Sequence, residues 1–114
     1  MTNYVIDYFE LPSSDVDASQ RFFAAAFGFG RTDYGPGYSE ITGAGVLGGL
    51  NGIEGDKPTA PLIGIRTADI EGAASAVRAA GGALVGEIVD YPGGRRFTFR
   101  EPGGSELLVY CPSE

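Results

Sequence analysis

The fold is decided by one pattern that occurs twice, as Tyr8-Phe9-Glu10-Leu11-Pro12-Ser13-Ser14-Asp15-Val16-Asp17 and as Leu62-Ile63-Gly64-Ile65-Arg66-Thr67-Ala68-Asp69-Ile70-Glu71. Each copy begins as an extended run and reaches an aspartate that can cap a helix. The two aspartates, Asp15 and Asp69, are 54 positions apart, which is nearly half of the chain. At the same offset Gly28 matches Gly82, so a strand, an acidic loop, a helix and a glycine stop follow one another twice.

The residues after each aspartate have the spacing of an amphipathic helix. The capping residue is Ser14 or Asp15 in the first helix and Asp69 in the second. The helices are expected to end at Gly28 and at Gly81-Gly82. Their apolar stripes are Val16, Phe22, Phe23 and Phe27 in the first helix and Ile70, Ala73, Ala74 and Val77 in the second. We expect the phenylalanines of the first helix to lie in the hydrophobic core.

Extended runs surround the helices, and glycine-rich stretches separate these runs. The predicted strands are 4–11, 38–42, 45–50, 62–66, 83–90, 95–100 and 106–111, and the glycine-rich stretches 28–37, 43–55 and 92–94 are expected to supply the turns between them. Either half of a 114-residue chain is too small to bury a core alone. The sequence therefore predicts one α+β domain over 1–114, built from two modules of about 1–56 and 57–114.

The composition of the chain excludes several kinds of partner and of catalytic site. The chain has 8 Lys and Arg against 15 Asp and Glu, and this net charge of −7 argues against nucleic acid or an anionic membrane as a partner. It has no histidine, which excludes Ser-His-Asp and Cys-His catalysis and zinc sites that use imidazole. The one cysteine, Cys111, is expected to be a buried structural thiol and fits a reducing, cytoplasmic location. No apolar run approaches the roughly 18 residues that span a bilayer.

Further stretches extend the pattern over nearly the whole chain. They are Phe22-Phe23, Phe27-Gly28-Phe29, Gly45-Val46-Leu47-Gly48-Gly49-Leu50, Ala80-Gly81-Gly82, Pro92-Gly93-Gly94-Arg95-Arg96-Phe97 and Phe99-Arg100-Glu101-Pro102-Gly103-Gly104. With them the chain resembles the vicinal oxygen chelate superfamily of glyoxalases, bleomycin-resistance proteins and dioxygenases, in particular its glyoxalase-like subgroup. The resemblance implies two βαβββ modules whose mixed sheet curls around a shared cavity that binds a small molecule. It also implies a homodimer, because family members commonly complete their cavities across a two-fold interface.

The resemblance further implies a divalent metal that is held by one residue from each of four strands. The first-strand ligand falls on Tyr8, the fifth-strand ligand on Leu62 and the last-strand glutamate on Leu108. The stretch 45–51 offers no carboxylate, histidine or cysteine. A register shift of one or two residues would bring Glu10 or Glu106 inward, which still leaves few ligands. We therefore expect no metal and no other cofactor.

Alternation along the predicted strands indicates which side chains face the cavity. The sets expected to pack on the helices are Val5, Phe9 and Leu11; Ile63 and Ile65; Phe97 and Phe99; and Leu107, Val109 and Cys111. The candidate ligand-binding residues lie on the other face: Tyr8, Glu10, Arg66, Arg96, Thr98, Arg100, Glu106, Leu108 and Tyr110. The alternative is a solvated sheet face on which charged side chains pair across strands.

The residue types on that face indicate what it can bind. Tyr8 and Tyr110 would form aromatic walls, and the arginines can hold a carboxylate or a phosphate, although pairing with Glu10 and Glu106 explains them equally well. Glu10 is a candidate general base. Three functions stay open: a metal-independent protein that binds a small organic molecule, a protein of the bleomycin-resistance kind that sequesters a cationic aromatic drug, and a metal-dependent lyase or dioxygenase.

Overall fold

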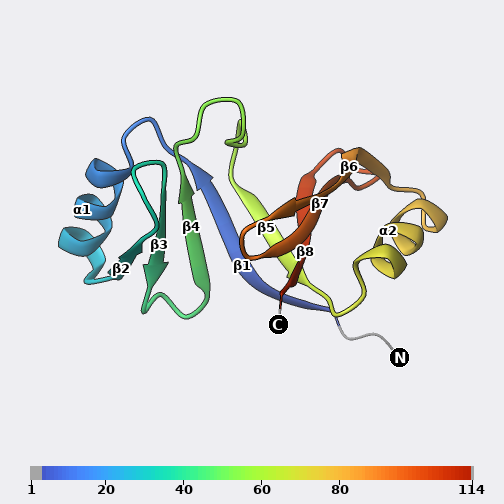
Figure 1. The fold of residues 1–114 in the computed structure, drawn as a ribbon, viewed down its shortest axis with the longest axis horizontal. Helices are drawn as coiled ribbons and strands as arrows, with labels where there is room; N and C mark the ends of the chain where they lie inside the picture. The colour runs from blue at the N-terminus through green and yellow to red at the C-terminus, as the bar shows by residue number, and fades with distance from the viewer. Residues whose placement is uncertain (1–3, 114) are drawn as a thin grey trace. The chain divides into compact units, whose positions relative to one another are not determined.

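A computed structural model describes residues 4–113 and contains two helices and eight strands over these residues (Figure 1). The elements are β1 (Val5–Pro12), α1 (Val16–Phe27), β2 (Gly30–Asp33), β3 (Tyr38–Thr42), β4 (Leu47–Asn51), β5 (Leu62–Arg66), α2 (Ile70–Ala79), β6 (Ala83–Tyr91), β7 (Gly94–Arg100) and β8 (Glu106–Pro112). They follow the order βαβββ twice, which confirms the α+β class and the paired modules. Within residues 4–113, no helix is long and apolar enough to cross a membrane.

One strand departs from the prediction. The turn predicted over 28–37 is wrong for Gly30–Asp33, which form β2 by antiparallel pairing with β3. All four residues of β2 are exposed, and none of them is apolar. Because strand prediction depends on alternating apolar residues, an exposed polar edge strand carries no such signal.

The chain divides into two compact units. One comprises Tyr8–Leu62, and the other comprises the residues from Ile63 onward together with the beginning of β1 up to Asp7. In the first unit the strand order is β2-β3-β4-β1, with β4 parallel to β1. In the second unit the order is β5-β8-β7-β6, with β8 parallel to β5. Each of these units, which we call the first and the second module below, therefore combines one parallel pair of strands with antiparallel pairs, as the prediction of a mixed sheet requires.

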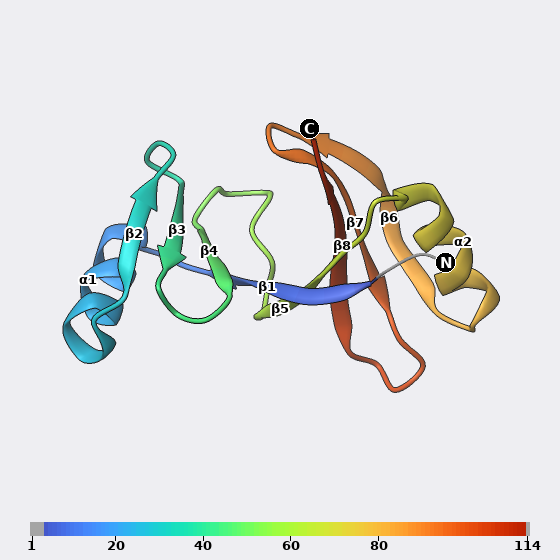
Figure 2. The same ribbon diagram turned by 90° about the horizontal axis from the view of Figure 1, so that it is seen from below.

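The core of the second module lies between α2 and one face of its sheet (Figures 1 and 2). Asp69 caps α2 by accepting a hydrogen bond of 3.0 Å from the Gly72 amide. The buried core residues are Ile70, Ala73, Ala74, Phe97, Phe99 and Val109, with Leu107 and Cys111 packed against them. The faces predicted for β7 and β8 are confirmed, and Cys111 is a partly buried free thiol.

Helix α1 does not place Phe22 and Phe27 in the core, so the prediction is wrong for these two residues, whereas Phe23 is half-buried. Phe22 and Phe27 are 59% and 62% exposed, and their rings contact each other at 6.2 Å between centroids. The buried residue of α1 is Gln20, whose Nε2 donates to Ser39 Oγ and to the Glu40 carbonyl at 2.7 Å each. Because this amide is anchored to β3, Gln20 faces the sheet and Phe22, two positions on, lies on the opposite side of the helix, whereas Phe27 is exposed at the last residue of α1.

Candidate functional site

Strand β1 presents Tyr8 and Glu10 on the face away from α1. Ser39 of β3 faces α1, because it accepts a hydrogen bond from the Gln20 side chain. In the strand register Ser39 pairs with Leu50 of β4, and Leu50 pairs with Leu11 of β1. Residues paired in register lie on the same face of a sheet, so Leu11 faces the helix. Tyr8 and Glu10 are an odd number of positions from Leu11 and lie on the opposite face, as alternation predicted.

A hydrogen-bond network joins the side chains of this face, and we call it the Tyr8–Glu10 network. Tyr8 donates to Glu10 Oε1 at 3.0 Å, and the Tyr8 and Tyr38 hydroxyls are 2.7 Å apart. Asn51 Nδ2 donates to Glu10 Oε2 at 3.2 Å and to Asp56 Oδ2 at 3.0 Å. Glu10 is 1% exposed, so these donors replace the water that its carboxylate would otherwise bind.

The environment of Tyr8 keeps its phenol protonated. Burial is the main cause that raises the pKa of Tyr8 well above its ordinary value, and the nearby charge of Glu10 adds to the effect. Because the phenol stays protonated near neutral pH, Tyr8 can donate a hydrogen bond to Glu10 in this range. Tyr8 therefore brings a hydroxyl donor and no charge of its own to this face of the sheet.

Two glycines of β4 make room for the aromatic side chains of β1. A Cβ on Gly49 would lie 2.1 Å from the Tyr8 hydroxyl and 2.5 Å from the Tyr38 hydroxyl. On the other face, a Cβ on Gly48 would lie 2.3 Å from Phe9 Cζ. The glycine-rich sequence of β4 thus allows side chains on both faces of the sheet to approach its backbone.

Gly49→Ala is expected to lower the free energy of unfolding by about 1–2 kcal/mol, because the added methyl group displaces both tyrosine hydroxyls. Urea denaturation measures the loss. The same substitution made together with Tyr8→Phe and Tyr38→Phe should cost less, since the two hydroxyls are then absent. An equal cost in both backgrounds would show that the hydroxyls are not what Gly49 accommodates.

In the second module, the predicted arginines lie on the face of the sheet opposite α2. The register places Arg66 of β5 and Arg96 of β7 beside Tyr110 of β8, one on each side. The next row of paired residues is Gly64, Leu108 and Thr98, and Arg100 pairs with Glu106 farther along. We call the row formed by Arg66, Tyr110 and Arg96 the arginine face; Arg66 is exposed, and Tyr110 and Arg96 are half-buried.

Asp7 is the acidic partner of the arginine face. Arg66 Nε lies 2.9 Å from Asp7 Oδ2, and the Tyr110 hydroxyl donates to Asp7 Oδ1. Burial, followed by this hydrogen bond, raises the pKa of Tyr110 above its ordinary value. Among the described residues Asp7 is the only ion-pair partner of Arg66, whose side chain is 51% exposed. The guanidinium of Arg66 is therefore accessible to an anion from solution.

The remaining predicted site residues have partners within the second module. Arg100 Nη2 contacts Glu106 Oε1 at 2.9 Å, which is the cross-strand pairing of the alternative interpretation. Arg96 lies over the Tyr91 ring, 5.8 Å from its centroid. Thr98 donates to the Val85 carbonyl at 3.0 Å, and Leu108 is fully buried.

Sequence reasoning missed four polar residues of these two clusters: Asp7, Tyr38, Asn51 and Asp56. Alternation assigns Asp7 to the same face as Phe9, and nothing in the local sequence indicates its contact with Tyr110. Tyr38 and Asn51 are paired in register on neighbouring strands, which is a signal that exists only once the strand pairing is known. Asp56 lies outside any strand or helix.

The side chains present do not fit a divalent metal of the kind that the resemblance implies. Leu62 and Leu108 have no donor atoms, and Tyr8 uses its hydroxyl in the network with Glu10. Over residues 4–113, no group of three or more Asp, Glu, Cys or His side chains is placed to hold a metal ion. One buried carboxylate and two phenols are a poor donor set for a transition metal.

Comparisons with known proteins give a family and a fold. The profile of the Glyoxalase/Bleomycin resistance protein/Dioxygenase superfamily matches residues 5–109. No curated protein sequence matches the chain. A superfamily member from Vibrio splendidus 12B01 is 22% identical, with a TM-score of 0.65 over 99% of this chain and 100% of that chain. Methylmalonyl-CoA epimerase from Mycobacterium tuberculosis is 15% identical, with a TM-score of 0.72 over 96% of this chain and 88% of that chain.

A metal-containing protein is also among the similar structures. The Mn(II)-bound glyoxalase from Novosphingobium aromaticivorans is 19% identical, with a TM-score of 0.65 over 93% of this chain. The present chain spans 38% of that protein's length. At these identities the solved structures establish a shared fold and nothing about ligands.

Proposed function

Because the chain belongs to the glyoxalase/bleomycin resistance protein/dioxygenase superfamily, we propose that it binds a small organic anion on the arginine face, without a metal ion. The observation that carries the proposal is the row formed by Arg66, Tyr110 and Arg96 across three neighbouring strands. Guanidinium groups bind planar or tetrahedral anions through paired N–H donors, and the phenol ring supplies an apolar wall. A methylmalonyl-CoA epimerase from Streptomyces coelicolor with this fold has been solved with 2-nitronate-propionyl-CoA, so acyl-coenzyme A compounds, whose phosphates are anionic, belong among the ligands to test.

Sequestration of a cationic aromatic drug is the second candidate, and the first module supplies an observation in its favour. Tyr34 is 59% exposed, and its ring lies 6.2 Å from that of Tyr38. The Tyr34 hydroxyl donates to Glu40 Oε1 at 3.2 Å. Aromatic rings beside carboxylates attract aromatic cations. The third candidate, a metal-dependent lyase or dioxygenase, has no suitable donor set among residues 4–113.

The two leading candidates differ in the sign of the ligand's charge, so a matched pair of probes separates them. Phenyl phosphate and benzylamine share a ring and carry opposite charges. In an NMR titration, phenyl phosphate is expected to shift the amide signals of Arg66, Arg96 and Tyr110. If benzylamine instead shifts Tyr34 and Glu40 while phenyl phosphate shifts nothing, drug sequestration replaces the anion proposal.

Glu10 is the candidate general base for any reaction on a bound molecule. Its carboxylate is 1% exposed and accepts hydrogen bonds from Tyr8 and Asn51. A substrate reaches it only if one of these contacts opens. Binding is therefore the activity we propose, and turnover would require a rearrangement of the network.

Purified protein is expected to carry no stoichiometric transition metal, because Tyr8, Leu62 and Leu108 occupy positions at which metal-binding relatives are expected to have ligands. Elemental analysis after dialysis is the measurement. About one Mn, Fe, Ni or Zn per chain would contradict the prediction and revive the metal-dependent alternative.

We also propose that the protein is a cytoplasmic homodimer. The terminal strands of the strand order, β2 and β6, leave sheet edges, and Phe22 and Phe27 expose apolar surface that a second copy can cover. Light scattering is expected to report twice the chain mass of 11.9 kDa at micromolar concentration. A single-chain mass at that concentration would rule out the dimer.

A further inference from the structure

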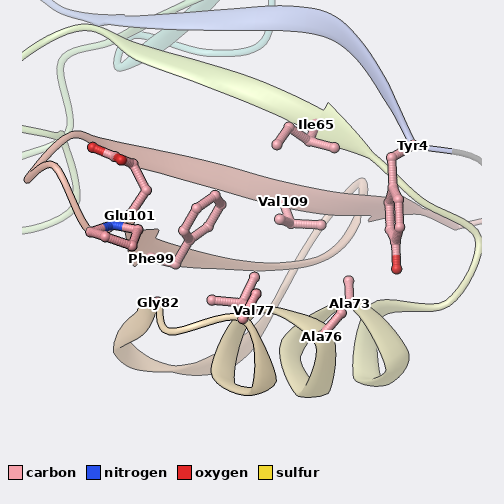
Figure 3. A pocket seen from close by; sticks show the side chains of 11 residues that line it. Tyr4, Ile65, Ala73, Ala76, Val77, Gly82, Phe99, Glu101 and Val109 are labelled. Atoms are coloured by element: carbon pink, nitrogen blue, oxygen red, sulfur yellow. The ribbon is translucent and has the colours of Figure 1, made fainter.

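An apolar cavity of about 320 Å³ lies between α2 and the sheet of the second module, on the side opposite the arginine face. Ala73, Ala76, Val77 and Ala80 line it from α2, and Phe99 and Val109 line it from the sheet. Figure 3 shows Tyr4 at one end of this cavity and Glu101 at the other. It is distinct from both polar clusters described above, and the proposed function makes no use of it.

The internal repeat explains why this space is unfilled. At the offset of 54 positions that relates the two modules, Val77 corresponds to Phe23, which is half-buried. Helix α2 therefore carries a smaller side chain where α1 carries an aromatic ring. Atoms that line an unfilled apolar space lose dispersion contacts, which a ligand of suitable shape restores.

The charge at one end of the cavity indicates the polarity of that ligand. Glu101 is the one charged residue among those that line the cavity. Its carboxylate is held by the amides of Gly103 and Ser105, at 2.8 Å each. These backbone hydrogen bonds hold the pKa of the Glu101 carboxyl below its ordinary range, so it is ionised near neutral pH. A hydrocarbon group that ends in a cation therefore complements the cavity and its rim.

We propose that this cavity binds a small amphiphilic amine, with the hydrocarbon body under α2 and the ammonium group beside Glu101. The cavity volume sets the size of the body. An apolar cavity of about 150 Å³ accommodates one benzene molecule. A cavity about twice as large accommodates an unbranched chain of about eight carbons or a bicyclic ring.

The test uses three probes with the same eight-carbon chain: octylamine, octan-1-ol and octanoate. Binding is measured from the NMR shifts of the amides of Ala73, Val77 and Phe99, which report on this cavity and not on the arginine face. Octylamine is expected to bind most tightly. Octan-1-ol is expected to bind about threefold more weakly, because it cannot form the exposed ion pair with Glu101. Octanoate is expected to bind more weakly than octan-1-ol. Octanoate that shifts these amides as readily as octylamine would overturn the assignment of an amine.

Two substitutions on α2 form a matched pair. Ala76→Phe adds an aromatic ring to a residue that lines the cavity, whereas Ala79 is on the same helix and does not line the cavity. Ala76→Phe is expected to abolish octylamine binding, and Ala79→Phe is expected to leave it unchanged. If Ala76→Phe does not fold, Ala80→Leu fills the same space with a smaller group. Unchanged octylamine binding in a folded cavity-filling variant would overturn the proposal.

A third substitution tests the rim. Glu101→Gln is expected to reduce the affinity for octylamine about threefold, to that for octan-1-ol, while the affinity for octan-1-ol itself stays unchanged. Equal octylamine binding by this variant and the original protein would overturn the role of Glu101. Sedimentation tests another occupant of the cavity, a second copy of the chain. If octylamine does not bind and Ala76→Phe converts a dimer to a monomer, the cavity is a contact between two copies and the proposal is wrong.

Discussion

Tyr8→Ala is expected to lower the free energy of unfolding by about 3–5 kcal/mol, the range for removing a well-packed aromatic side chain. Two losses contribute. The ring no longer fills the space above Gly49, and the buried carboxylate of Glu10 loses the hydroxyl that donates to it at 3.0 Å. Urea denaturation followed by circular dichroism measures the change.

Two controls separate these losses. Tyr8→Phe keeps the ring and is expected to cost about 1.5–3 kcal/mol, the range for a hydrogen bond to a charged group. In a double-mutant cycle, Tyr8→Phe should cost less once Glu10→Gln has removed the charge. If Tyr8→Ala lowers the free energy of unfolding by less than about 1 kcal/mol, the Tyr8 ring lines an accessible ligand site and is not part of a buried network.

Arg66→Met is expected to weaken the binding of phenyl phosphate by about ten- to a hundredfold, the equivalent of one or two charge-assisted hydrogen bonds. Methionine keeps much of the length of the arginine stem and removes the guanidinium. The affinity is measured by titration of the same NMR signals that report on the arginine face. Arg66→Lys should give a smaller loss, because an ammonium keeps the charge but not the planar arrangement of donors.

The control for Arg66→Met is Arg78→Met. Arg78 is exposed in the last turn of α2, so this variant makes the same change in net charge away from the arginine face. Its affinity for phenyl phosphate is expected to match that of the original protein. Equal losses in the two variants would mean that overall charge, and not a site at Arg66, attracts the anion.

Both predictions depend on face assignments that alternation makes available from the sequence. Phe97 and Phe99 lie toward α2, and Thr98 lies on the other face with its neighbours on β8. Tyr8 and Glu10 likewise lie away from α1. These assignments could be made because apolar side chains recur at alternate positions of each strand, and a pleated strand turns alternate side chains to opposite faces.

The partners of the polar side chains could not be assigned in the same way. Asp7 contacts Tyr110, which is 103 positions away, and Asn51 reaches both Glu10 and Asp56. Each contact depends on which strands are neighbours and in which register they pair. No local pattern encodes either quantity, so the network and the acidic partner of the arginine face emerge only from the folded chain.

The sequence by itself determined the repeat, the two capping aspartates, the α+β class and the apolar face of the second module. Tertiary structure alone decided that Phe22 is exposed, since the hydrogen bonds from Gln20 to Ser39 and Glu40 fix which side of α1 meets the sheet, and that Phe27 is exposed at the end of the helix. Helical spacing identifies an apolar stripe but not the rotation at which the helix meets its sheet. The rotation observed satisfies the buried amide of Gln20, which would destabilise the fold if it were left without hydrogen-bond partners.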